Sequence, residues 1–142
     1  MDFSLSEEQT MLQDSVQRFV QNDYSFDQRQ KPVKEGEGFS REVWQNFAEL
    51  GWLALPFSEE VGGIGGGPIE TMILMEEFGK GLVVEPYLST ILLAGKALEE
   101  AGTSAHKEGL LGEIIAGSKL GCLLYTSPSP RDLSTSRMPS SA

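Results

Sequence analysis

The stretch Phe47–Leu82, FAELGWLALPFSEEVGGIGGGPIETMILMEEFGKGL, decides the fold of this 142-residue chain. Gly51 stands where a helix needs a left-handed residue at its C-terminal end, so the stretch opens with the last turn of a helix. Residues 52–67 contain Pro56 and a run of glycines, which predicts an extended crossing and a turn. Pro68 can then begin a new helix, because its missing N–H costs nothing at the first position.

The helix that begins at Pro68 is apolar on nearly every side and ends at Gly79 and Gly81. This pattern is typical of a helix that is buried all round, so we predict that it is the central helix of the fold. Its apolar residues are Ile69, Met72, Ile73, Leu74, Met75 and Phe78.

Two capping boxes precede this stretch. Ser6 and Ser25 each stand three residues before a glutamine, which is the spacing of a capping box. The first helix runs to about Tyr24. Pro32 limits the second to a short helix, and residues 31–38 are expected to form a loop.

Two further serines, Ser40 and Ser104, can cap amphipathic helices that Gly51 and Gly117 close. The apolar face of the first carries Val43, Phe47 and Leu50 with Trp44 beside them, and that of the second carries Leu110, Leu111, Ile114 and Ile115.

Pro86 begins another helix, which runs to about Glu100. Gly95 within it costs about 1 kcal/mol relative to alanine, which indicates a close contact between helices. The residues predicted to point inward are Leu88, Ile91 and Leu92. Because residues 1–117 contain no convincing alternating stretch, the chain is predicted to be all-α with about six helices.

The charge and the rare residues exclude several classes of function. The net charge is −10, and the last 21 residues carry +1, so residues 1–121 carry −11. Such a surface repels nucleic acid and anionic membranes, so neither is an expected partner. One cysteine and one histidine cannot make an internal disulfide or the usual zinc clusters, so no metal site is predicted. The chain has no secretory signal or membrane-spanning run, and a cytoplasmic location is expected.

No catalytic or cofactor-binding residue is assigned from the pattern. The glycine run does not fit a phosphate-binding motif, because the third glycine of that motif would fall on Pro68. Glu76 and Glu77 are adjacent on a helix and point about 100° apart, so they cannot share a proton. His106 is expected to be exposed and has no visible acid–base partner.

Four signatures appear in order along the chain, and together they resemble the amino-terminal domain of the flavin-dependent acyl-CoA dehydrogenases. They are DFSLSEEQTMLQDSVQRFV (2–20), the stretch 47–82, EPYLSTILLAG (85–95) and HKEGLLGEIIAGSKLG (106–121). The resemblance covers residues 1–121 and implies a bundle of about six helices of the orthogonal or up-down type. The EPYL variant is similar to the subgroup that includes pimeloyl-CoA dehydrogenase-like small subunits.

The resemblance implies a function that this chain serves only in part. A family member uses FAD to oxidise an acyl-CoA thioester to the trans-2-enoyl-CoA, with an electron-transfer flavoprotein as oxidant, and forms a homo- or hetero-oligomer. The flavin and the catalytic carboxylate belong to a middle β domain and a carboxy-terminal bundle, so the chain alone is expected to be inactive and not to hold FAD tightly. Pro86, Tyr87 and Leu88 correspond to a wall of the acyl pocket; the alternative is that they simply pack the start of a helix.

The ending, residues 122–142, has a different origin in our interpretation. CLLYTS, PSPRD and SRMPSSA can be written as translated segments of a common sequencing adapter, with LST over its variable index. We expect a disordered, non-native tail after a truncated gene, and the alternative is a native Ser/Pro tail. For the body, the alternative to a dehydrogenase fragment is a stand-alone helical interaction module. An acyl-CoA oxidase relative that uses O₂ also stays open.

Overall fold

The computed structural model describes residues 4–36 and 38–121, and every regular element among them is helical, so the all-α prediction is confirmed. The elements are α1 (Glu7–Asn22), α2 (Phe26–Glu35), α3 (Arg41–Glu49), η1 (Glu59–Val61), α4 (Pro68–Gly81), η2 (Leu88–Gly95), α5 (Lys96–Ala101), α6 (Ser104–His106), η3 (Lys107–Leu111) and α7 (Gly112–Ile115). Because η2 continues into α5, and α6 continues through η3 into α7, the described residues form six helical segments and one short turn, η1. The predicted tail, residues 122–142, lies outside the described residues.

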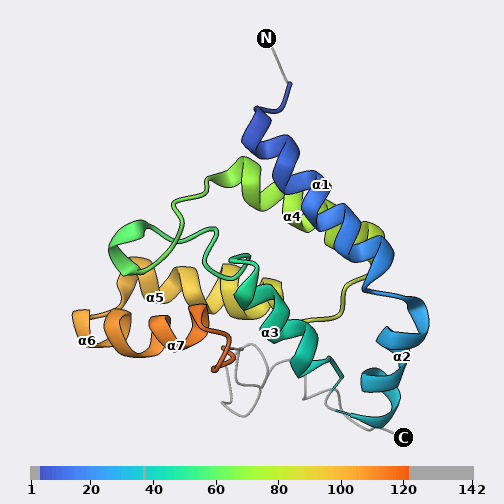
Figure 1. Ribbon diagram of the computed structural model, residues 1–142. Helices are drawn as coiled ribbons and strands as arrows, with labels where there is room; N and C mark the ends of the chain where they lie inside the picture. The colour runs from blue at the N-terminus through green and yellow to red at the C-terminus, as the bar shows by residue number, and fades with distance from the viewer. Residues whose placement is uncertain (1–3, 37, 122–142) are drawn as a thin grey trace, which may run out of the picture.

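Two pairs of neighbouring helices organise the fold (Figure 1). Helices α1 and α4 lie side by side and run in the same direction, because Gln9 of α1 binds Glu70 early in α4, whereas Val20 meets Gly81 at its end. The segment α6–α7 runs back along η2 and α5. Helix α3 crosses between the two pairs.

The helix starts follow the sequence closely. Ser6 and Ser25 both form complete capping boxes, in which the serine hydroxyl oxygen accepts from a backbone N–H and the serine amide donates to the side-chain oxygen of the glutamine. The loop predicted for residues 31–38 begins later, because α2 continues through Pro32 to Glu35. Pro32 removes one donor, but its own carbonyl still accepts from the Gly36 amide, so the last turn closes.

Helix α4 is not buried all round, so the prediction that it is buried on every side was wrong. Ile73, Leu74 and Phe78 are buried, whereas Ile69 and Met72 are about half exposed, at 48% and 53%. The reason is that, within the described residues, α1 and the core cover only one side of α4.

The connection between α3 and α4 is more compact than the extended crossing that the sequence predicted. Residues 50–57 form consecutive turns, and the glycine run folds back on them. Gly62 and Gly65 have φ of 85° and 77°, the left-handed region that glycine adopts without strain. The amides of residues 64, 65 and 66 donate to the carbonyls of residues 54, 57 and 55, so they are not free to hold a phosphate.

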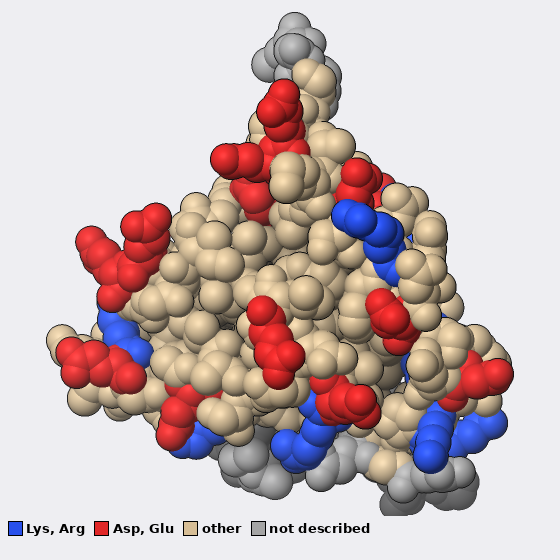
Figure 2. Space-filling view, in the orientation of Figure 1, with Lys and Arg blue, Asp and Glu red and all other residues tan. Residues whose placement is uncertain are grey.

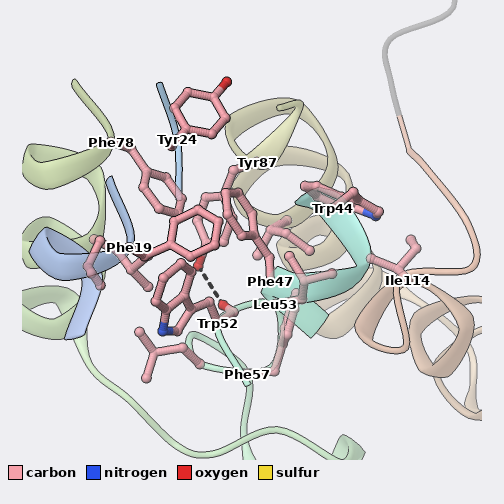
Figure 3. Close-up of a cluster of buried hydrophobic side chains, with 14 of the residues drawn as sticks. Phe19, Tyr24, Trp44, Phe47, Trp52, Leu53, Phe57, Phe78, Tyr87 and Ile114 are labelled. Carbon is pink, nitrogen blue, oxygen red and sulfur yellow. Dashed lines mark hydrogen bonds between the residues drawn. The ribbon is translucent and has the colours of Figure 1, made fainter. Parts of the chain in front are cut away.

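Aromatic rings from three helices and the turn after α3 form the centre of the core (Figure 3). The Phe47 ring stacks on Phe78 at 4.9 Å between centroids and lies 5.2 Å from Trp52 and 5.6 Å from Phe19. Burying each such side chain contributes about 1.5–3 kcal/mol, so this cluster holds α1, α3 and α4 together.

The last helical segment begins one residue earlier than predicted. Thr103 rather than Ser104 is the cap, since its side-chain oxygen accepts from the His106 amide at 3.4 Å. His106 is exposed, as predicted. Within the described residues, no helix has the length and apolar character needed to cross a bilayer.

Candidate functional site

The three residues predicted to line the acyl pocket lie at the start of η2, and the structure gives each a different setting. Tyr87 is buried, donates its hydroxyl to the Trp52 carbonyl at 3.0 Å and packs edge-on against Phe78 at 5.4 Å. Burial raises the pKa of Tyr87 above its ordinary value. Pro86 is half-buried, and Leu88 is 54% exposed rather than pointing inward. Tyr87 therefore anchors this segment, and Leu88 offers apolar surface.

The connection that leads from α4 to these residues exposes further apolar side chains. Leu82 is 65% exposed, and Val84 is partly exposed. Leu82 has φ 50° and ψ 47°, and among the described residues it is the non-glycine residue with a positive φ. We call Leu82, Val84 and Leu88 the apolar edge.

A buried carboxylate lies behind the apolar edge. Glu85 is 6% exposed, and its two oxygens accept from the Tyr24 hydroxyl at 2.7 Å and from the Ser40 amide at 3.3 Å. The Tyr24 hydroxyl in turn accepts from the Val84 amide at 3.0 Å. Burial, followed by the hydrogen bond to Glu85, raises the pKa of Tyr24.

The end of α4 is held by a cation from α2. One Arg29 guanidinium nitrogen donates to the carbonyls of Gly81 and Leu82, at 3.0 and 3.2 Å. The same guanidinium lies 5.0 Å from the centre of the Phe26 ring. Arg29 is thus fixed on both sides, and it satisfies carbonyls that the end of a helix leaves without partners.

Sequence reasoning assigned no role to Tyr24, Arg29 or Glu85. The one local signal was Glu85 itself, an acidic residue directly before Pro86 in an otherwise apolar run. Its partner Tyr24 lies 61 residues away, so the pair appears only once the chain is folded.

Glu76 and Glu77 share a cation and not a proton. Lys80 lies 2.9 Å from Glu76 and 2.7 Å from Glu77, and Gln13 also donates to Glu77 at 3.4 Å. The hydrogen bonds that Lys80 donates to Glu77 and then to Glu76 raise the pKa of Lys80. This arrangement agrees with the prediction that the two carboxylates are not an acid–base pair.

Two of the cavities among the described residues have several charged residues in their linings. One, of about 490 Å³, lies beside Tyr24 and Glu85, and the other, of about 640 Å³, lies between the glycine loop and the α5–η3 region. The charged residues of the first are Asp23, Arg29, Lys31, Glu42 and Glu85, and those of the second are Glu60, Lys96, Glu99, Glu100, Lys107 and Glu108. Figure 2 shows the acidic side chains spread over the face in view.

These cavities do not fit a flavin dinucleotide. Carboxylates outnumber cations in both linings, and a pyrophosphate needs the opposite balance. Lys96 is already bonded to the Pro56 carbonyl and to Glu99. In residues 4–36 and 38–121, no three His, Cys, Asp or Glu side chains are grouped so that they could hold a metal ion.

The described residues form a helical domain in which buried hydrogen bonds hold the apolar edge in place. Residues 6–118 match the family model described as acyl-CoA dehydrogenase, N-terminal domain, and the chain belongs to the acyl-CoA dehydrogenase family.

Curated relatives and solved structures agree with this membership. The chain is 32% identical to an acryloyl-CoA reductase (NADH) of Anaerotignum propionicum, in a match that covers 90% of the chain and 32% of the reductase. It is 30% identical to a short-chain-specific acyl-CoA dehydrogenase of Clostridium acetobutylicum, in a match that covers 90% of the chain and 34% of that dehydrogenase. It is similar to the ChsE4–ChsE5 complex of Mycobacterium tuberculosis, with a TM-score of 0.76 and 27% identity over 84% of the chain and 33% of the other. The fold also matches butyryl-CoA dehydrogenase of Megasphaera elsdenii, with a TM-score of 0.70 and 24% identity over 84% of this chain and 32% of that one. The chain spans about a third of the length of these relatives.

Proposed function

We propose that this chain is the amino-terminal part of an FAD-dependent acyl-CoA dehydrogenase, which oxidises an acyl-CoA thioester to the trans-2-enoyl-CoA. The observation that carries the proposal is the family match over residues 6–118, in a chain that spans about a third of its relatives' length. In this proposal the chain supplies part of the acyl pocket and is inactive alone.

The start of η2 is the part of the chain that we assign to the acyl pocket. Pro86, Tyr87 and Leu88 are the proposed wall, with Tyr87 as the buried anchor and Leu88 as the side chain with the most free surface. An acyl chain is apolar, so its contact with the apolar edge would remove apolar surface of both partners from water. Each Å² of apolar surface buried in this way contributes about 25 cal/mol to the binding free energy.

The flavin and its partners belong to the rest of the proposed protein. We propose that FAD is held by the rest of the protein, where it would supply the hydride acceptor, and the excess of carboxylates in the two charged cavities supports this. The proposed partners are an acyl-CoA substrate, an electron-transfer flavoprotein and further subunits, and the ChsE4–ChsE5 relative is itself a complex of two named proteins. We propose a cytoplasmic location.

Two preparations test this function. The 142-residue chain, purified and desalted, is expected to show no visible flavin absorbance and no oxidation of acyl-CoA by an artificial electron acceptor. The chain extended by the genomic sequence that follows Gly121 is expected to be yellow and active. A yellow 142-residue chain, or a colourless and inactive extended protein, contradicts the proposal.

The half-exposed Ile69 and Met72 of α4 favour one alternative, a stand-alone helical module that binds a partner. That alternative expects residues 1–121 to be a stable, cooperatively melting monomer. The dehydrogenase proposal expects marginal stability or self-association of the same residues. Thermal melting together with sedimentation velocity separates the two.

A further inference from the structure

A buried glutamate, Glu85, lies in the chain between Val84 and Leu88 of the apolar edge. Glu85 is 6% exposed and lies beside the first of the two charged cavities, although a carboxylate is costly to bury unless it is hydrogen-bonded. Its bonds to Tyr24 and Ser40 satisfy both oxygens. An apolar residue could fill the same space without any partner, so packing alone does not account for a glutamate at this position.

The bonds around Glu85 fix backbone as well as side chains. The Tyr24 hydroxyl donates to Glu85 and accepts from the Val84 amide. Ser40 donates its own amide to Glu85, while its hydroxyl caps α3 by accepting from Val43 at 3.3 Å. The end of α1, the start of α3 and the backbone at residue 84 are thus joined at one carboxylate.

The other end of the same connection carries backbone strain. The left-handed conformation has an energetic cost for a leucine that a glycine at position 82 would not have. The Leu82 side chain is 65% exposed, so burial among the described residues does not repay this cost. Arg29 holds the two carbonyls around the strained residue.

We propose that Tyr24 and Glu85 are positioning residues for the acyl-CoA substrate: they hold the backbone of residues 84–88 so that the apolar edge keeps one geometry toward the acyl chain. Arg29 does the same for Leu82, which becomes a further contact residue of that edge. This inference rests on the proposed function.

The first test measures the backbone directly in the 142-residue chain. Tyr24→Phe removes the acceptor of the Val84 amide, and we expect hydrogen exchange of that amide to speed up about tenfold or more, with little change in the amides of α1. Glu85→Ala is expected to act in the same way, and Glu85→Gln, which keeps an oxygen acceptor, to restore slow exchange. If Tyr24→Phe does not fold, the double variant Tyr24→Phe/Glu85→Gln removes the buried charge with the hydroxyl and is measured instead.

The matched control is Glu77→Gln. Glu77 is also a buried glutamate, 2% exposed, but its partners Lys80 and Gln13 lie outside residues 82–88. We expect this variant to leave exchange at Val84 unchanged. Equal exchange at Val84 in Tyr24→Phe and the parent chain would overturn the proposal.

The second test uses the extended, flavin-containing protein. The Tyr24→Phe and Glu85→Ala variants are expected to raise KM for the preferred acyl-CoA about tenfold while kcat stays within about twofold, and to weaken the preference among acyl lengths. Faster exchange at Val84 without any change in KM or in that preference also overturns the proposal. If the parent enzyme itself turns over no acyl-CoA, the proposed function fails, and with it the substrate part of this inference; the exchange result still decides whether residues 84–88 are held as described.

Discussion

Gly95 of η2 lies directly against the ring of Phe57, so closely that a Cβ on the glycine would stand 2.5 Å from Phe57 Cζ. Phe57 is completely buried, and the backbone carbonyl of Thr90 lies 3.2 Å from the same Cβ position. Gly95→Ala is therefore expected to destabilise the chain, because overpacking costs about 1–3 kcal/mol and the helix propensity of alanine returns only about 1 kcal/mol. Urea unfolding followed by circular dichroism measures the difference.

The control for this prediction is Gly79→Ala in α4. A Cβ at Gly79 meets nothing within 4 Å, so only the propensity gain of up to about 1 kcal/mol is expected. If both alanine variants are stabilised alike, Phe57 moves aside and the close contact does not constrain η2.

Phe47 is expected to be the most costly single truncation in the core. It is fully buried and contacts the rings of Phe19, Trp52 and Phe78, so Phe47→Ala should lose about 3–5 kcal/mol, a large part of the total stability of a small domain. Phe26→Ala, at an exposed ring, should lose less than about 1 kcal/mol. A loss of the same size in both variants would show that the aromatic cluster is not the centre of the core.

Glu70 should make the free energy of unfolding depend on pH in the acid range. It accepts from the Gly67 amide at 2.8 Å and from Gln9 at 2.7 Å, and the bond from Gln9, followed by backbone bonds, lowers its pKa despite some burial. A lowered folded pKa contributes stability above the unfolded value of about 4.3, and this contribution is lost as the pH falls through the folded pKa.

Glu70→Ala should therefore cost about 1 kcal/mol near neutral pH and less at about pH 3, as measured by urea midpoints. The control is Glu8→Gln in the exposed first turn of α1, where only a few tenths of a kcal/mol are expected. A Glu70→Ala penalty that does not shrink in acid contradicts this account.

Tyr24 and Tyr87 should make the chain sensitive to alkali. Burial raises the pKa of both phenols, so their folded values exceed the unfolded value of about 10. Their contribution to stability is complete below pH 10 and is lost as the pH rises through the folded values. The third tyrosine of the chain, Tyr125, is replaced by phenylalanine so that only Tyr24 and Tyr87 contribute to the signal. In this Tyr125→Phe background, phenolate absorbance should not rise near pH 10 unless the helices melt. Ionisation of both tyrosines near pH 10 with intact circular dichroism would refute the burial of their hydroxyls.

The sequence by itself determined where α1 to α4 begin and that the glycine run does not follow a phosphate-binding motif. The elements η2 and α6 begin at Leu88 and Ser104, within two residues of the predicted starts. The caps at Ser6 and Ser25 and the proline start at Pro68 are interactions within about four residues, so neighbouring side chains encode them completely. The sequence also indicated a close contact at Gly95, because a glycine inside a helix is unfavourable unless it allows close packing, but the partner is Phe57 in the turns after α3 and not a residue of another helix.

Only the tertiary structure decided which apolar residues are exposed and which polar residues are buried. Ile69 and Leu88 fit an inward position by helical spacing, yet both are about half exposed, because no described element covers their side of the helix. Tyr24 and Glu85 carry no joint signal, since they are 61 residues apart and meet only when α1, α3 and the connection after α4 converge. Local backbone bonds are fixed by adjacent residues, whereas burial depends on which distant segments pack together, and that is a property of the folded chain.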